Sequence, residues 1–147
     1  MKQFSPNESA VKRHLMNENA DDASAAHMAA RLTAWFTTAA QRDNVKFLFA
    51  AEQTEATCEL TLVAGNRDLL RADRTFVTLQ GERWLVDFKF SQPATASALA
   101  LEAERYQPQL RQYAALLTKL DQSRGFTRPI RAALYFPWLD VLHEMRL

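Results

Sequence analysis

Only one cysteine, Cys58, occurs among the 147 residues. The chain therefore cannot close a disulfide within itself or build a four-cysteine zinc or iron–sulfur site. Long apolar runs are also missing, since none approaches the roughly 20 residues of a membrane-spanning helix. The N-terminal residues lack the apolar core of a signal peptide. We therefore expect a cytoplasmic protein in a reducing compartment, with no membrane partner.

An excess of charge of one sign is missing as well. The 18 Lys and Arg residues nearly balance 17 Asp and Glu residues, which leaves a net charge of +1. Bulk attraction to nucleic acid is thereby excluded, and any such contact must come from a local patch. An apolar fraction of 48% is typical of a globular protein, and this length favours one domain. We expect a polar N-terminal segment over residues 1–21 and a single domain over residues 22–147.

The clearest helical pattern is an alanine-rich run that follows Asp21 and Asp22 and extends to Ala40. Its apolar side chains recur at helical spacing, namely Met28, Leu32, Trp35, Phe36 and Ala39. The acidic start also suits the helix dipole. His27 lies in the first turns of this predicted helix. A partly exposed helix histidine is the commonest explanation for it, and a metal ligand facing a carboxylate cluster is the alternative.

The middle of the chain has the alternation and turn residues of an antiparallel meander. Strands are predicted over residues 57–63, 69–79 and 84–90, with turns at Gly65-Asn66 and Gly81-Glu82. An extended segment is expected over 45–50. Helices are predicted over 96–105 and from Pro108 to Leu120, and a strand over 129–136 joins the sheet after that crossover. The tail over 138–147 is expected to form a short strand or helix.

These elements predict an α/β fold. A central mixed sheet, formed by the antiparallel meander and the strand added after the helix crossover, is flanked by helices. We expect the helix that carries His27 and the helix that carries Gln109 to pack against this sheet.

The strand over residues 84–90 organises the candidate site. Side chains alternate between the two faces of a strand. The face expected to be buried against helices consists of Trp84, Val86, Phe88 and Phe90. The other face carries Leu85, Asp87 and Lys89, and burying an unpaired charge is costly. The two charged residues therefore form either a structural ion pair or a site in which Asp87 holds a divalent cation and Lys89 holds a water or an anionic oxygen.

Several residues, taken in order, repeat a known pattern. The chain has His27 in a helix, Glu59, Asp73 in a strand, Asp87-Phe88-Lys89 in the next strand and Gln109-Leu-Arg-Gln-Tyr113 in a following helix. Asp73 lies one turn away from Asp87, so the two are expected to be close. The set resembles the PD-(D/E)XK nuclease superfamily, most closely the RecB-like nuclease domain at the C-terminus of UvrD/Rep-type helicases of the RecB and AddA kind. The resemblance covers about residues 22–136.

The resemblance implies a restriction-endonuclease-like fold and a metal-dependent deoxyribonuclease. Asp73 and Asp87 would be the core ligands of Mg²⁺ or Mn²⁺, with the main-chain carbonyl of Phe88 as a third ligand and His27 as an additional one. Lys89 would orient the attacking water or stabilise charge that develops on the phosphate. The implied partners are DNA, as single strands or duplex ends, and a UvrD/Rep-type helicase.

Further residues have supporting roles under this resemblance. Gln109 and Tyr113 would brace the site or contact the DNA backbone. Glu59 is either a second carboxylate behind the ligands or an exposed strand residue. Candidate phosphate contacts, for which solvated surface arginines are the commoner explanation, are Arg71, Arg74 and Arg111.

Two alternatives to an active nuclease stay open at this point. One is a catalytically silent domain of the same fold that binds DNA or docks on a helicase. The other is an unrelated α/β protein in which Asp87 and Lys89 are merely paired. The chain has no Gly-x-x-x-x-Gly-Lys-Ser/Thr loop, so it cannot itself supply the helicase motor. ATP-driven DNA processing would belong to a partner or to a missing N-terminal part.

Overall fold

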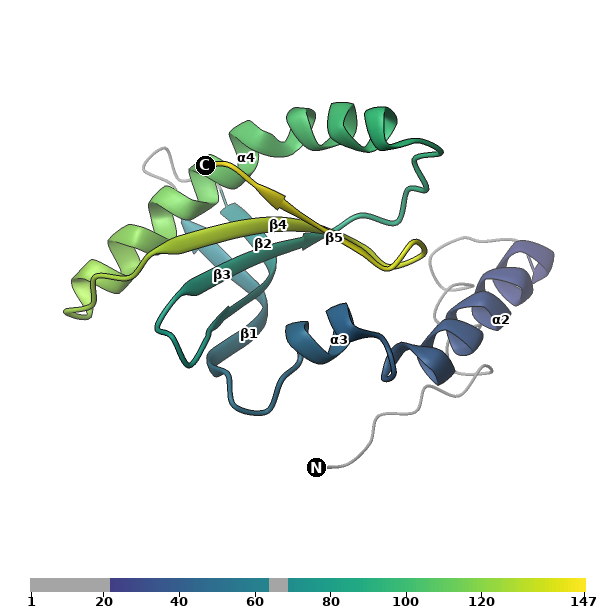
Figure 1. Ribbon diagram of the computed structural model, residues 1–147, viewed down its shortest axis with the longest axis horizontal. Helices are drawn as coiled ribbons and strands as arrows, with labels where there is room; N and C mark the ends of the chain where they lie inside the picture. Colours follow the sequence, from purple (N-terminus) through teal and green to yellow (C-terminus); the bar gives the residue numbers. More distant parts are fainter. Residues whose placement is uncertain (1–21, 64–68) are drawn as a thin grey trace. The chain divides into compact units, whose positions relative to one another are not determined.

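A computed structural model describes residues 22–63 and 69–147 (Figure 1). The chain divides into two compact units, one ending at Leu48 and one beginning at Phe49. The polar segment predicted over residues 1–21 and the turn predicted at Gly65-Asn66 lie outside the described residues. No helix of the described part combines the length and the hydropathy that crossing a membrane requires.

The first unit contains two helices. Helix α2 (Asp22–Ala39) confirms the helix predicted from the alanine-rich stretch. Helix α3 (Asp43–Leu48) replaces the extended segment predicted over 45–50, so that prediction was wrong. The main-chain N–H of Lys46 donates to the carbonyl of Arg42, and its ammonium lies 3.4 Å from the Asp43 carboxylate. Side chains three positions apart meet on a helix, and a run this short cannot be assigned by periodicity alone.

The second unit is built on one sheet of five strands in the order β1-β2-β3-β4-β5. The strands are β1 (Thr54–Val63), β2 (Leu69–Val77), β3 (Arg83–Phe88), β4 (Ile130–Phe136) and β5 (Val141–Met145). Strands β3 and β4 run parallel, and every other neighbouring pair is antiparallel. The α/β class, the mixed sheet and the strand added after a helix crossover are therefore confirmed. The tail forms the edge strand β5.

A single long helix, α4 (Ala96–Ser123), makes the crossover between β3 and β4. Thr95 caps it by accepting a hydrogen bond from the N–H of Ala98 at 3.1 Å. The prediction of two helices separated before Pro108 was wrong, because Pro108 lies inside α4. A proline costs an interior helix one hydrogen bond and causes a steric conflict with the preceding turn. The helix bends along its length (Figure 1), which is how such a conflict is commonly relieved.

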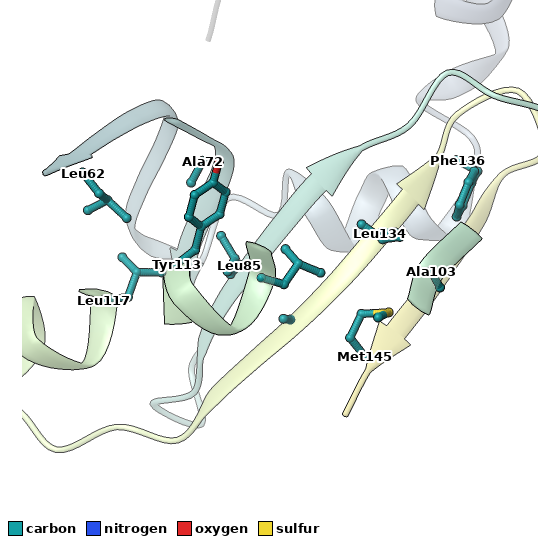
Figure 2. Packing of buried hydrophobic residues seen from close by; sticks show 11 residues of the cluster. Leu62, Ala72, Leu85, Ala103, Tyr113, Leu117, Leu134, Phe136 and Met145 are labelled. Carbon is teal, nitrogen blue, oxygen red and sulfur yellow. The ribbon is translucent and has the colours of Figure 1, made fainter. Parts of the chain in front are cut away.

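The core lies between α4 and the sheet (Figure 2). Leu85 of β3 belongs to it with Tyr113 and Leu117 of α4, and all three are buried. This helix therefore covers the face of β3 that carries Leu85, not the face of Trp84 and Val86 for which helix packing was predicted. Both faces of β3 are in fact buried, as is usual for a central strand with a parallel neighbour.

Candidate active site

Two carboxylates meet where the β2–β3 ladder ends. The ladder ends with Arg74 paired to Val86, and one further step in this antiparallel register sets Asp73 opposite Asp87. Directly opposed residues project from the same face of a sheet. At this point Asp73 Oδ2 accepts a hydrogen bond from the main-chain N–H of Phe88 at 2.7 Å. Where the main-chain hydrogen bonds between β2 and β3 end, this side-chain hydrogen bond fixes the carboxylate of Asp73 beside β3.

Lys89 supplies a positive charge that directly contacts one of these carboxylates, that of Asp87. Its Nζ lies 2.5 Å from Asp87 Oδ2, and the two side chains are 17% and 8% exposed. Even so, Asp87 Oδ2 is buried and accepts no well-oriented hydrogen bond from any described residue. The ion pair is therefore short, but it leaves Asp87 Oδ2 without a well-oriented hydrogen-bond donor.

The electrostatics of Asp87 follow from this arrangement. Burial raises the pKa of the Asp87 carboxyl, the ammonium of Lys89 lowers it in part, and the carboxylate of Asp73 raises it again. The balance is a raised pKa, so one lysine does not compensate for burial and for the second carboxylate. A further positive charge placed beside the two carboxylates would lower this pKa again.

Helix α4 supports Lys89 through a residue that the sequence analysis missed. The Nζ of Lys89 lies 3.6 Å from the centre of the Tyr106 ring, a cation–π contact. The main-chain N–H of Lys89 donates to the carbonyl of Tyr135 at 2.8 Å, which continues the β3–β4 ladder past Phe88. Tyr106 precedes Gln109 by three positions and Tyr113 by seven, so the three share one helix face. That spacing was the available signal.

Gln109 and Tyr113 contact each other on α4. Gln109 Nε2 donates a hydrogen bond to the Tyr113 hydroxyl at 2.7 Å. Tyr113 is 3% exposed and belongs to the core, and Gln109 is half-buried. The two side chains lie on the helix face that also carries Tyr106, and their role in bracing the site or contacting DNA stays a prediction.

The remaining acidic and histidine candidates are Glu59, on β1 of the second unit, and His27, on α2 of the first unit. His27 is exposed on α2 in the first unit, so its role as a metal ligand stays a prediction. Glu59 is exposed on β1 with a left-handed φ of 55°. Its carboxylate lies 3.7 Å from Arg71, and both side chains are well exposed, at 68% and 64%. This is an ordinary surface ion pair of small energetic value.

The arginine candidates differ in exposure. Arg74 is buried, donates hydrogen bonds to Cys58 Sγ and Gln53 Oε1, and packs over the ring of Phe49. Its guanidinium therefore serves packing around β2. Arg71 and Arg111 are exposed, and their contact with phosphate stays a prediction.

A separate ionic cluster lies at the opposite end of β3. Arg83 is 2% exposed and makes a bidentate pair with Asp121 of α4, at 2.7 and 2.6 Å. Arg83 and Arg128 also donate to the two oxygens of Glu55, at 2.5 and 2.7 Å. Burial lowers the pKa of Arg83, but the bonds to Asp121 and Glu55 outweigh it and raise that pKa. The cluster fixes the end of α4 to the start of β3.

Within residues 22–63 and 69–147, no group of three or more His, Cys, Asp and Glu side chains is arranged to hold a metal ion. Asp73 and Asp87 provide two carboxylates, and Phe88, whose N–H is bonded to Asp73, offers a main-chain carbonyl as a further donor. Mg²⁺ is commonly bound through one or two carboxylates while it keeps several waters. The donor set therefore suits Mg²⁺ or Mn²⁺ better than a metal that needs a full set of protein ligands.

A scan of protein-family models found no match to this chain, and no curated protein matches it either. Any function must therefore be argued from the geometry of Asp73, Asp87 and Lys89.

Proposed function

We propose that this chain is a metal-dependent DNA nuclease module of the PD-(D/E)XK type, with a restriction-endonuclease-like fold. One observation supports the proposal most. Asp73 and Asp87 come together on neighbouring strands, and the Lys89 ammonium lies 2.5 Å from Asp87. This is the arrangement that the resemblance to RecB-like domains implies for a hydrolytic site. The cytoplasmic location expected from the sequence belongs to this proposal as well.

Mg²⁺ or Mn²⁺ fits the charge of the site. The Asp87 oxygen that faces Lys89 is buried without a well-oriented hydrogen bond, and the pKa of Asp87 is raised. When bound, such a cation supplies Lewis acidity for the phosphate and lowers the pKa of a bound water. Asp73, Asp87 and the carbonyl of Phe88 would hold it. Asp73 is pre-positioned for this role by its hydrogen bond from the Phe88 N–H.

Lys89 carries the second part of the proposed chemistry. With a cation held by Asp87, the ammonium of Lys89 would be available to face an attacking water or a phosphate oxygen. Tyr106 lies against Nζ at 3.6 Å and acts as a positioning residue, because its ring keeps the ammonium at the end of β3. Gln109 and Tyr113 hold the same helix face in place. Stabilising charge on the phosphate is the largest contribution expected from a fixed cation of this kind.

A second candidate function is a catalytically silent domain of the same type, which binds DNA or docks on a UvrD/Rep-type helicase. The absence of a third side-chain ligand among the described residues favours it. The close pairing of Lys89 with Asp87 also favours it, since a lysine that stays paired is unavailable for catalysis. Metal binding without cleavage would support this candidate.

The test is cleavage of labelled single-stranded and duplex DNA with Mg²⁺ or Mn²⁺, and with EDTA. We expect metal-dependent cleavage that is lost in Lys89→Ala and kept in Lys119→Ala, a matched variant of an exposed lysine on α4. Cleavage that persists in Lys89→Ala would contradict the assigned site. If no variant cleaves, adding a UvrD/Rep-type helicase separates a module that needs its partner from a silent one.

A further inference from the structure

A groove of about 520 Å³ lies between the edge strand β1 and the C-terminal half of helix α4. Four consecutive residues of β1, 60–63, form one wall. The other wall consists of Leu116, Lys119 and Leu120 of α4 and of Arg124 at its C-cap. All of them belong to the second unit. Lys119 follows Tyr106 by 13 positions on α4, a separation of roughly 20 Å along a helix, so the groove is distinct from the candidate active site.

The wall formed by β1 is the edge of the sheet and not one of its faces. Successive side chains of a strand project from opposite faces, and yet all four residues from 60 to 63 line the groove. Strand β1 is the first in the sheet order, with β2 as its neighbour. The other edge of its main chain therefore has no strand partner within the described sheet, and this edge borders the groove.

Two glutamates limit the regular part of this edge. Glu55 and Glu59 have left-handed φ angles of 48° and 55°, which depart from the extended conformation of a strand. After Glu59, the register with β2 is unbroken from Leu60 to Val63. The regular part of the edge thus coincides with the wall of the groove. It has room for an added strand of about four residues, which is roughly 13 Å long.

The groove combines an aliphatic surface with basic side chains. Its aliphatic surface includes three leucines that are only partly buried against the core, namely Leu60, Leu116 and Leu120. Among the described residues, no carboxylate lines the groove, and Lys119 has no ion-pair partner. Glu59, which precedes the groove on β1, is already paired with Arg71. The charge of the lining is therefore positive.

Arg124 belongs to an ionic cluster that has more cations than anions. Arg83, Arg124 and Arg128 share the carboxylates of Glu55 and Asp121. Three guanidinium groups against two carboxylates leave one positive charge in excess. Arg124 is the most exposed of the three, at 53%, and its contact with Glu55 is the longest, at 3.6 Å. Its guanidinium is thus the one that an external carboxylate can reach.

We propose that this groove binds an extended segment of a partner protein, which adds as a strand to the free edge of β1. The segment has aliphatic side chains at alternate positions and an acidic side chain that pairs with Lys119 or Arg124. In this mode of recognition, main-chain hydrogen bonds supply affinity, and pockets for alternate side chains supply specificity. The two basic residues select an acidic segment and disfavour a basic one.

The free edge distinguishes a peptide from other anionic ligands with an aliphatic part. A fatty acid matches the leucines and the basic side chains of the groove, but it has no main chain to pair with β1. An added strand satisfies all three features of the groove at once. The inference goes beyond the proposed nuclease activity and does not rest on it, because the groove contains none of the residues assigned to cleavage.

The experiment titrates a fluorescein-labelled peptide, Glu-Val-Thr-Val-Thr-Val-Glu, with the full chain and follows anisotropy. In an extended peptide the N–H groups of the valines point to one edge and those of the threonines to the other. N-methylation of one set should abolish binding, and N-methylation of the other set should leave it unchanged, because one edge pairs with β1. Lysine in place of both glutamates should also abolish binding.

A charge reversal on the protein tests the basic wall. Lys119→Glu should weaken binding of the peptide about fivefold or more. Arg105→Glu makes the same type of change at another exposed position of α4, outside the groove, and should bind as the wild type does. Equal losses in the two variants would show bulk attraction in place of a site and would overturn the inference.

The peptide also separates an added strand from other modes of binding. No binding by the wild type at millimolar concentration, or equal effects of the two N-methylations, would overturn the added strand. Decanoate, which has an aliphatic chain and a carboxylate, is titrated in parallel by calorimetry. If decanoate binds and Lys119→Glu weakens it while the peptide does not bind, the groove takes an acyl chain and the proposed partner is wrong.

Discussion

Replacing Asp87 with asparagine should make the folded protein more stable near neutral pH. The change keeps the size of the side chain and removes its charge. Asp87 has a raised pKa in the folded state because it is buried and because Asp73 lies beside it, with Lys89 compensating only in part. A group with a folded pKa above its unfolded value near 3.8 disfavours the folded state when it is ionised.

The magnitude follows from the burial of the carboxylate. Its side chain is 8% exposed, and Oδ2 accepts no well-oriented hydrogen bond within the described structure. An unsatisfied buried polar group costs about 1–3 kcal/mol. We expect Asp87→Asn to recover about that amount, which corresponds to roughly 4 °C in Tm for each kcal/mol in a protein of this size. The opposite change, Lys89→Met, should lower stability, because it removes the cation that partly compensates for Asp87.

Urea unfolding in EDTA, followed by circular dichroism, gives the free energy of unfolding over a range of pH. The advantage of Asp87→Asn should be largest at neutral pH, shrink as pH falls through the folded pKa of Asp87, and vanish below about pH 4, where both states are protonated. Lower stability of Asp87→Asn at neutral pH would refute the reasoning. The carboxylate would then be a structural partner of Lys89, and the case for a metal site would lose its main support.

Three further predictions concern the ionic cluster around Arg83 and the ring of Tyr106 on α4. Asp121→Ala should destabilise the protein by about 3–5 kcal/mol in urea unfolding, because it removes the buried carboxylate that pairs with Arg83 and leaves that guanidinium only the more exposed Glu55; a loss under about 1 kcal/mol would contradict that account. The hydrogen bond from Arg128, against burial and with help from Arg83, holds the pKa of Glu55 below 4.5. Glu55→Gln should therefore be less stable than wild type above about pH 4.5, and this gap should close as pH falls through the folded pKa; a gap that is constant with pH would count against it. Tyr106→Leu should reduce the cleavage rate about 2- to 30-fold by loosening the site lysine, whereas Tyr106→Phe should not; equal rates in both would remove the positioning role.

The meander and its site were predictable because the signals are local. Alternating apolar residues and a turn at Gly81 define β2 and β3, and Gly81 indeed has a φ of 79°. A short turn between antiparallel strands fixes their register, and register alone brings Asp73 opposite Asp87. The residues of the candidate site on β2 and β3 therefore followed from the sequence.

What could not be predicted depends on tertiary contacts. The strand pattern defines two faces of β3 and favours the more apolar one, that of Trp84 and Val86, for helix packing. It therefore does not show that α4 covers the side of Leu85, which also carries charged residues. Helix α4 continues through Pro108 because Leu110, Tyr113 and Leu117 are buried in one core, and packing outweighs the local cost. The contact between Lys89 and Tyr106 joins side chains from separate elements. The spacing of Tyr106, Gln109 and Tyr113 indicates a shared helix face, but it does not show this contact.

Binding of Mn²⁺ to the purified chain, measured by electron paramagnetic resonance of the free ion, tests the central claim most directly. The account predicts that wild type binds Mn²⁺, that Mg²⁺ competes for the same site, and that Asp73→Asn and Asp87→Asn each abolish binding. Glu104→Gln, which changes an exposed carboxylate on α4, should bind as wild type does. Failure of the wild type to bind, or binding that survives both aspartate substitutions, would contradict the claim that Asp73 and Asp87 form a metal site.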